Sequence, residues 1–254
     1  MGRIKDRVGE INYNTFGSKM IIVKYNGCND MVIYFPEYNW YYYDGKYHHF
    51  KEGNIKCPYE KRWLDKGYIG EGEYNYNSDS FKYWIGILKR VYDNNEHLRH
   101  PSYNNVELYE PWHCFQEYGY WHKENYYTIN GEIMELDKDI LFKGNKIYSP
   151  STCIYVPHRI NSLFTKSDSA RGDYPIGVTY HKRDCVYESK LSYLNKYGKK
   201  DRIYLGRFNN PLEAFLSYKQ AKETLIKQVA DEYRPYIPKE LYEAMYKWEV
   251  DIND

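Results

Sequence analysis

The chain has 254 residues, long enough for one large domain or for two to three small ones, each with a buried core. Its 36 lysine and arginine residues balance 35 aspartate and glutamate residues, so the net charge of +1 excludes a globally basic nucleic-acid coat but not a local basic face. The five cysteines never occur as Cys-x-x-Cys, which argues against a zinc ribbon or a disulfide framework and favours a reducing cytoplasm.

Tyrosine is the unusual feature of the composition, with 33 residues. Its ring suits half-buried sheets and polar binding surfaces, although free use of Tyr, Asn, Lys and Ile in an AT-rich genome explains the same count. No run of about 20 apolar residues occurs, and charges appear early at the N-terminus. We therefore expect a soluble, cytoplasmic protein without a membrane or export segment.

Residues 1–66 are expected to form a small N-terminal β-rich module. Three apolar or aromatic runs predict strands at 19–25, 31–35 and 38–43. Asp44-Gly45 is the strongest short hairpin signal in the chain, because glycine accepts the positive φ of a two-residue turn. The aromatic face of this sheet is expected to pack into its own core, with a binding partner as the alternative.

Residues 67–165 are expected to form the central part of the protein. Apolar residues recur at helical spacing over 80–92, with Asp79 as the N-cap of that helix. A second helix is expected over 112–121, where aromatic residues share one face.

The stretch 134–161 carries the candidate site of this central part. In order, it contains an acidic strand (Asp137, Asp139), a turn (Gly144, Asn145), a second strand (153–156), a proline break and Asn161. Carboxylate and carbonyl oxygens are the ligands that Mg²⁺ and Mn²⁺ prefer, so the stretch is a candidate metal site. The structural alternative is that the two aspartates are turn and cap residues flanking a strand.

These motifs carry a resemblance to a known family. They are, in order, Arg90 on a helix, Trp112-x-x-Phe115, Leu136-Asp137-Lys138, Gly144-Asn145, Pro150 to Cys153, and Asn161. Over about residues 68–164 the chain resembles the phage and intron-associated HNH (His-Me finger, ββα-metal) endonucleases. The resemblance implies that Asp137 and Asn161 hold Mg²⁺ or Mn²⁺, which would neutralise the scissile phosphate.

Lys138 stands where that family has its general base, a histidine. A lysine has to lose about 3 pKa units to act as a base near neutral pH. Three interpretations remain open: Lys138 contacts phosphate, or His113, His122 or His158 is the base, or the site is inactive and only the fold is retained. His158 precedes Asn161 by one helical turn if a helix begins there. The candidate catalytic residues are Lys138, Asp139 and His158.

A polar linker over 165–172 is expected to separate the central part from a C-terminal part at 173–234. The expected strands begin at Gly177, cover 186–193 and cover 202–205. A helix follows from Leu212 to about Ala230, with Asn210 as its N-cap. The sequence therefore predicts three strands packed on one helix.

Three motifs of this part carry a second resemblance: Gly177-Val178, Tyr204 to Phe208, and Pro211-x-Glu-Ala-Phe-x-x-Tyr. Over about residues 174–223 they are similar to the Apetala-type (ethylene-response-factor) DNA-binding domain. The resemblance implies that the sheet lies in the major groove of double-stranded DNA. The matched candidate contacts are Lys182, Arg183, Lys190, Arg202, Tyr204 and Arg207. Thr179 stands where that family has an arginine, so this contact is not carried over.

Basic residues gather on this sheet and its turns, which favours a DNA-binding surface independently of the resemblance; a solvated charged face is the alternative. Residues 235–254 are expected to form a C-terminal helix and an acidic tail. The expected fold is α+β, with an N-terminal β module, a ββα-metal (HNH-like) core and a three-stranded sheet packed on one helix.

The expected function is metal-dependent nicking or cleavage of DNA by a phage protein of the homing-endonuclease type, acting in the cytoplasm of a bacterial host. Flanking DNA-binding modules would raise the concentration of a weak nuclease core at its site. A catalytically inactive DNA-binding regulator is the first alternative. The second is an inhibitor that binds a host protein or nucleic acid through the Tyr-rich face.

Overall fold

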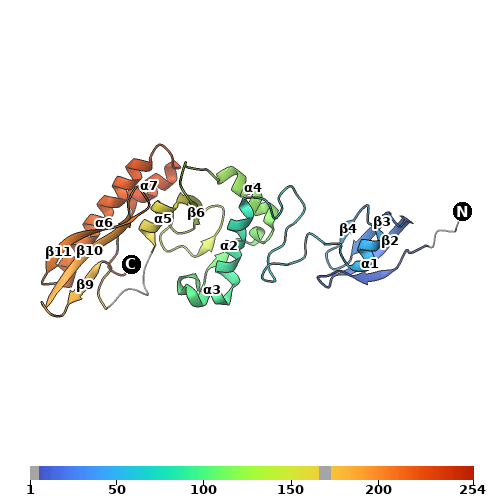
Figure 1. The fold of residues 1–254 in the computed structure, drawn as a ribbon, viewed down its shortest axis with the longest axis horizontal. Helices are drawn as coiled ribbons and strands as arrows, with labels where there is room; N and C mark the ends of the chain where they lie inside the picture. Colours follow the sequence, from blue (N-terminus) through green and yellow to red (C-terminus); the bar gives the residue numbers. More distant parts are fainter. Residues whose placement is uncertain (1–5, 166–172) are drawn as a thin grey trace. The chain divides into compact units, whose positions relative to one another are not determined.

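The computed structural model describes residues 6–165 and 173–254, in which helices and strands are mixed (Figure 1). The chain divides into two compact units, 1–124 and 125–254. The α+β class expected from the sequence is confirmed. The boundary between the units falls inside the segment 67–165, which we expected to form one part.

Unit 1 begins with a four-stranded antiparallel sheet whose strands lie side by side in chain order. Its elements are β1 (Ile11–Tyr13), β2 (Lys19–Gly27), β3 (Asp30–Phe35), β4 (Trp40–Tyr42) and the helix α1 (Tyr47–Glu52). The three predicted strands are confirmed, and β1 and α1 are additions to them. The inner face of the sheet packs on α1 through Met20, Ile22, Met31, Ile33, Phe35 and Phe50.

Asp44-Gly45 does not form the hairpin that its sequence predicts. Asp44 has a left-handed φ of 55°, and the chain passes from β4 into α1 instead of into another strand. The Gly45 amide donates to the Met31 carbonyl at 2.9 Å, and a Cβ at Gly45 would lie 2.8 Å from Ile33 Cδ1. The glycine is therefore needed for close packing of this turn on β3, a requirement that the two-residue motif does not distinguish from a hairpin.

The remainder of unit 1 is mainly helical. Its elements are α2 (Ser80–Tyr92), α3 (Asn94–Arg99), η1 (Pro101–Tyr103), β5 (Glu107–Leu108), η2 (Glu110–His113) and α4 (Phe115–Asn125). The helix predicted over 80–92 is confirmed, but Asp79 already has helical φ and ψ and its side chain makes no capping bond. The second predicted helix begins at Phe115 rather than at Trp112, because Trp112 belongs to the short 3₁₀ turn η2.

Unit 2 opens with strands that lead into a short helix. Its first elements are β6 (Met134–Asp137), β7 (Ile147–Tyr148), β8 (Ile154–Pro157) and α5 (His158–Phe164). β6 and β8 are antiparallel neighbours, and the chain enters α5 directly after Pro157. The second predicted strand is confirmed, as is the turn at Gly144, where φ is +82°. The first is confirmed only up to Asp137, because β6 ends there and Asp139 lies in the turn that follows. The side chains that this arrangement brings together differ from those expected.

The C-terminal part of unit 2 is a three-stranded antiparallel sheet packed on a long helix (Figure 1). Its elements are β9 (Val178–His181), β10 (Val186–Leu194), β11 (Lys200–Phe208), α6 (Pro211–Tyr233) and α7 (Lys239–Lys247). β10 is the central strand. The predicted N-cap is confirmed, since Asn210 Oδ1 accepts the Leu212 amide at 2.8 Å. Apart from Thr165, the linker expected at 165–172 lies outside the described residues.

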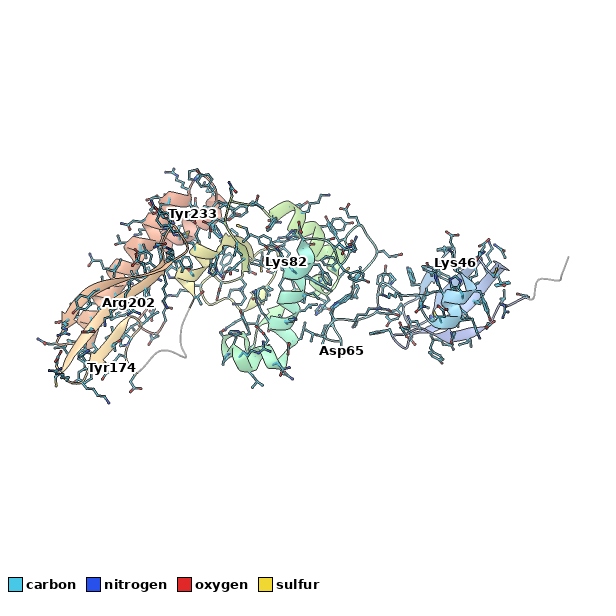
Figure 2. All side chains as sticks on the ribbon, viewed as in Figure 1. Lys46, Asp65, Lys82, Tyr174, Arg202 and Tyr233 are labelled. Carbon is cyan, nitrogen blue, oxygen red and sulfur yellow. The ribbon has the colours of Figure 1, made fainter. Side chains whose placement is uncertain are left out.

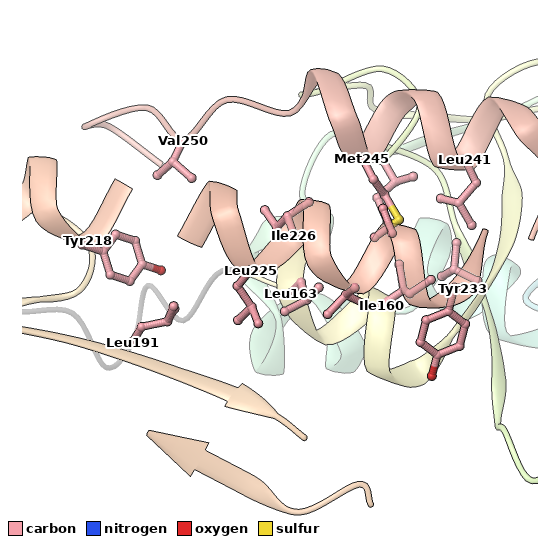
Figure 3. Close-up of a cluster of buried hydrophobic side chains, with 14 of the residues drawn as sticks. Ile160, Leu163, Leu191, Tyr218, Leu225, Ile226, Tyr233, Leu241, Met245 and Val250 are labelled. Carbon is pink, nitrogen blue, oxygen red and sulfur yellow. The ribbon is translucent and has the colours of Figure 1, made fainter. Parts of the chain in front are cut away.

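One hydrophobic core runs along α6 and joins the sheet to α5 and α7 (Figure 3). Leu191 comes from β10, Ile160 and Leu163 come from α5, and Leu241 and Met245 come from α7. Because successive side chains of a strand point to opposite faces, this packing leaves the other face of the sheet open.

All five cysteine thiols are free. Within the described parts of the chain, no helix has the length and apolar character needed to cross a membrane.

Candidate functional site

The register of β6 and β8 decides which side chains meet at the start of α5. Met134 pairs with Pro157, whereas Asp137 pairs with Ile154 at the other end of the two strands. Since α5 begins directly after Pro157, its first turn lies beside the start of β6. Asp137 lies about 10 Å further along that strand. The carboxylate nearest to α5 is therefore a different one.

Glu135 is the carboxylate that α5 contacts. Its Oε1 lies 2.8 Å from Nδ1 of His158, and its Oε2 accepts the amide of Asn161 at 2.5 Å. The side chains of His158 and Glu135 are 51% and 32% exposed, so the pair is accessible. When Nδ1–H of His158 donates to Glu135, Nε2 of the same ring is left as a proton acceptor. The pair can therefore act as a general acid or base.

The carboxylate of Asp137 caps the turn that follows β6. Its Oδ1 accepts the backbone N–H groups of Asp139 at 2.8 Å and of Ile140 at 2.7 Å. Burial, followed by the nearby carboxylate of Asp139, raises the pKa of Asp137 above its ordinary value. These contacts match the turn-and-cap role that was the structural alternative to a metal ligand.

Lys138 and Asn145 close the loop between β6 and β7. Nζ of Lys138 donates to the Asn145 carbonyl at 3.0 Å and to Asp139 Oδ2 at 3.2 Å. In return, Nδ2 of Asn145 donates to the carbonyls of Lys138 at 2.7 Å and Ile147 at 2.8 Å. Lys138 is only 7% exposed, so its ammonium group stabilises the loop. Gly144 supplies the positive φ of this turn.

The two other histidines considered as bases lie in unit 1. His113 Nε2 is 2.6 Å from the hydroxyl of Tyr92, and its Nδ1 is 2.8 Å from the Glu110 carbonyl. Burial lowers the pKa of His122 to about 4, so this ring stays neutral near pH 7. Hydrogen bonds and burial give His113 a structural role, and burial against the rings of Tyr83 and Tyr118 gives His122 one.

The predicted metal ligands Asp137 and Asn161 are engaged with different partners. Over residues 6–165 and 173–254, no group of three or more His, Cys, Asp or Glu side chains is arranged to hold a metal ion. Glu135, His158 and Asn161 do converge, but they bond to one another and supply one carboxylate, short of the oxygen-rich set that Mg²⁺ prefers. The side chains present do not fit the expected Mg²⁺ or Mn²⁺.

The outer face of the C-terminal sheet brings together four of the predicted DNA contacts. Lys190 of β10 lies directly opposite Tyr204 of β11, and Arg207 lies opposite Glu188. Arg202 continues the same face along β11, and Figure 2 labels it on this sheet. A bulge in β11, where Leu205 has no partner on β10 and Gly206 has a positive φ, places Tyr204 and Arg207 on one face despite their odd spacing.

Glu188 holds two of these cations in place. Its carboxylate is bonded to Nζ of Lys190 through Oε2 and to Nε and Nη2 of Arg207 through Oε1, the last two at 3.1 and 3.0 Å. The hydrogen bond from Lys190, and then that from Arg207, keep the pKa of Glu188 below its ordinary value despite burial. The third guanidinium nitrogen of Arg207, Nη1, lies 3.1 Å from Oδ2 of Asp184. The guanidinium group is therefore fixed before any ligand arrives.

The other two predicted contacts, Lys182 and Arg183, lie in the exposed turn between β9 and β10. Thr179, where the Apetala-type domains have an arginine, is exposed on the outer face opposite Glu188. The ring of Tyr204 is 55% exposed. Basic, hydroxyl and aromatic groups thus share one accessible surface.

Two functional candidates, Glu135 and Glu188, were missed from the sequence. Strand alternation places Glu135 on the face of Asp137, and Glu188 on the face of Lys190. The spacing of two residues is visible in the sequence, and it could have indicated that each glutamate shares a face with the neighbouring candidate residue. The partners of the two glutamates depend on register, which the pattern does not supply.

No known protein family, curated protein or solved structure matches the chain.

Proposed function

We propose that the chain binds double-stranded DNA through the outer face of its C-terminal sheet. The observation that carries this proposal is the gathering of Lys190, Arg202, Tyr204 and Arg207 on one open face, with two of the cations fixed by Glu188. The major groove admits a β-ribbon, in which lysine contacts phosphate and the arginine fork reaches base edges. A single module of this kind covers about 600–1,000 Å² of protein surface.

The test is fluorescence anisotropy of a labelled duplex over a salt series of about 50 to 200 mM. Arg202→Ala and Lys190→Ala are each expected to weaken binding and to reduce the slope of log affinity against log salt by about 1 where the side chain contacts phosphate. Lys227→Ala is the matched control, because Lys227 is exposed on α6, which packs on the inner face. Binding that both sheet variants leave unchanged would contradict the proposal.

A second candidate function, hydrolysis of the DNA backbone, is favoured by the pairing of His158 with Glu135. Nε2 of His158 would take a proton from the attacking water, while Glu135 orients the ring and stabilises its protonated form. General base catalysis of this kind contributes about 10²–10⁴-fold to a rate.

Nicking of supercoiled plasmid in buffers containing Mg²⁺ or Mn²⁺ tests this candidate. His158→Ala is expected to lower the nicking rate at least about 10²-fold, and Glu135→Gln to lower it as well. Asp137→Asn is the control, since an amide oxygen keeps the capping acceptor. Nicking that requires Asp137 but not His158 would support the assignment implied by the HNH resemblance instead.

A further inference from the structure

The outer face of the N-terminal sheet, opposite α1, carries an aligned row of apolar and aromatic side chains. Ile11 pairs with Ile21, Ile21 with Tyr34, and Tyr34 with Tyr41, so the row crosses all four strands. The rings of Tyr34 and Tyr41 stack with centroids 4.6 Å apart and planes at 29°. Ile11 and Tyr41 are 51% and 42% exposed. This row lies outside the core that α1 covers.

Two lysines of β2 lie on either side of the row. Lys19 is opposite Tyr13 of β1, whose ring is 58% exposed, and Lys24 is opposite Val32 of β3. Because Val23 has no partner on β3, the two lysines lie four ladder positions apart, which is about 13 Å. Neither ammonium group forms an ion pair or hydrogen bond within the described residues 6–165 and 173–254.

A bulge puts Lys24 on this face. Ile22 points inward and pairs with Ile33, so regular alternation would also turn residue 24 inward. The register shift between Ile22 and Lys24 reverses that phase, and Lys24 pairs instead with the outward Val32. Bulges re-aim side chains in this way beside binding sites.

Negative charge is scarce on the outer face of the N-terminal sheet. Among the described strand positions on this side, Asp30 is the one carboxylate, at the end of the β2–β3 hairpin. It already accepts a hydrogen bond from Nδ2 of Asn26 at 2.8 Å. The two lysines therefore leave a cationic surface around the tyrosine rings, which is complementary to a polyanion with flat apolar groups.

We propose that this face binds single-stranded nucleic acid. The phosphates follow β2 between Lys19 and Lys24, and bases stack on the exposed ring of Tyr41, which the half-buried ring of Tyr34 supports from its other side. Aromatic platforms beside a basic track bind single strands with little sequence preference, because every base presents a stacking surface. This inference uses residues of unit 1 only and does not rest on duplex binding by the C-terminal sheet.

The experiment measures the anisotropy of labelled (dT)₁₂ with the full chain carrying Lys190→Ala, Arg202→Ala and Arg207→Ala, which removes cations from the C-terminal face. Tyr41→Ala is expected to weaken binding about 5- to 150-fold, the range typical for loss of one ring on which a base stacks. Lys19→Gln with Lys24→Gln is expected to weaken binding and to reduce the salt slope by about 0.7 for each lost contact.

Lys51→Gln serves as the control, because Lys51 is exposed on α1 at the opposite face of the sheet. Circular dichroism shows whether each variant keeps the fold of its parent. The proposal is overturned if the folded parent does not bind (dT)₁₂, or if Tyr41→Ala and the double lysine variant bind as tightly as the parent. In the second case the oligonucleotide binds elsewhere, and a protein ligand becomes the better fit to the tyrosine row.

Discussion

Lys222 lies on the face of α6 that packs against the core, and only 9% of it is exposed. No hydrogen bond or ion pair to its ammonium group occurs within the residues that the structure describes. Burial disfavours the charged form and lowers the pKa of Lys222 from 10.5 to about 8. Among the described residues, no partner therefore offsets the cost of burying most of this charged side chain at neutral pH.

Replacing this lysine by methionine is expected to raise the free energy of unfolding at pH 7 by about 2–3 kcal/mol, because each unit of pKa shift corresponds to about 1.4 kcal/mol. The unfolded chain binds more protons than the folded chain between the two pKa values, so wild-type stability rises with pH from about 8 to 10.5. Denaturant unfolding at pH 7 and pH 9 should show the advantage of Lys222→Met shrinking by about 1 kcal/mol.

Lys227→Met on the exposed side of the same helix is the control and is expected to change stability little. Equal unfolding free energies for wild type and Lys222→Met at pH 7 would mean that the ammonium group finds a partner.

The turn after β6 is held by the side chain of Asp137. Oδ1 of Asp137 accepts two backbone N–H groups, so Asp137→Ala leaves both without this acceptor and is expected to cost about 1–2 kcal/mol of stability. Asp137→Asn keeps an oxygen acceptor and is expected to stay within about 0.5 kcal/mol of wild type. Thermal unfolding compares the three proteins. A loss of similar size in both variants would show that the negative charge matters, as it would for a metal ligand.

The elements that could be predicted from the sequence are those with a local signal. Helical spacing located α2, and Asn210 with Pro211 located the start of α6. β1 has three residues and α1 has six, which is too short for a period to emerge. Asp44-Gly45 was wrongly predicted to form a hairpin, because a glycine at this position is compatible both with a turn into a strand and with the observed turn into α1.

The candidate site depended on information that local patterns do not contain. The helix carrying Asn161 was predicted to return over β6, and α5 does contact that strand. Pairing of Met134 with Pro157 then selects Glu135 rather than Asp137 as the carboxylate it meets. A strand register is set by packing and loop length across the intervening residues, which a single sequence leaves undetermined.

The net charge of +1 results from charges that are distributed unevenly over the surface of the protein. Cations gather on the outer face of the C-terminal sheet, and the tyrosine row of the N-terminal sheet is flanked by Lys19 and Lys24, which have no partner in the part of the chain that the structure describes. The net charge therefore does not indicate which surfaces of the protein bind an anionic ligand, because binding depends on the local distribution of charge. If both proposed surfaces bind nucleic acid, each raises the effective concentration of the ligand at the other, provided that one ligand spans both.

The two units also differ in the cores that hold them together. Phe50 belongs to the core of the N-terminal sheet and Leu191 to the core along α6, and these two cores share no residue among those that the structure describes. Leu191→Ala is expected to cost about 2–5 kcal/mol and Phe50→Ala about 3–5 kcal/mol, each in the unit that loses the side chain. Hydrogen exchange resolved by residue should show faster opening around α6 and β10 for the first variant, and over the N-terminal sheet and α1 for the second. Faster exchange throughout the chain in both variants would mean that the units unfold as one cooperative body.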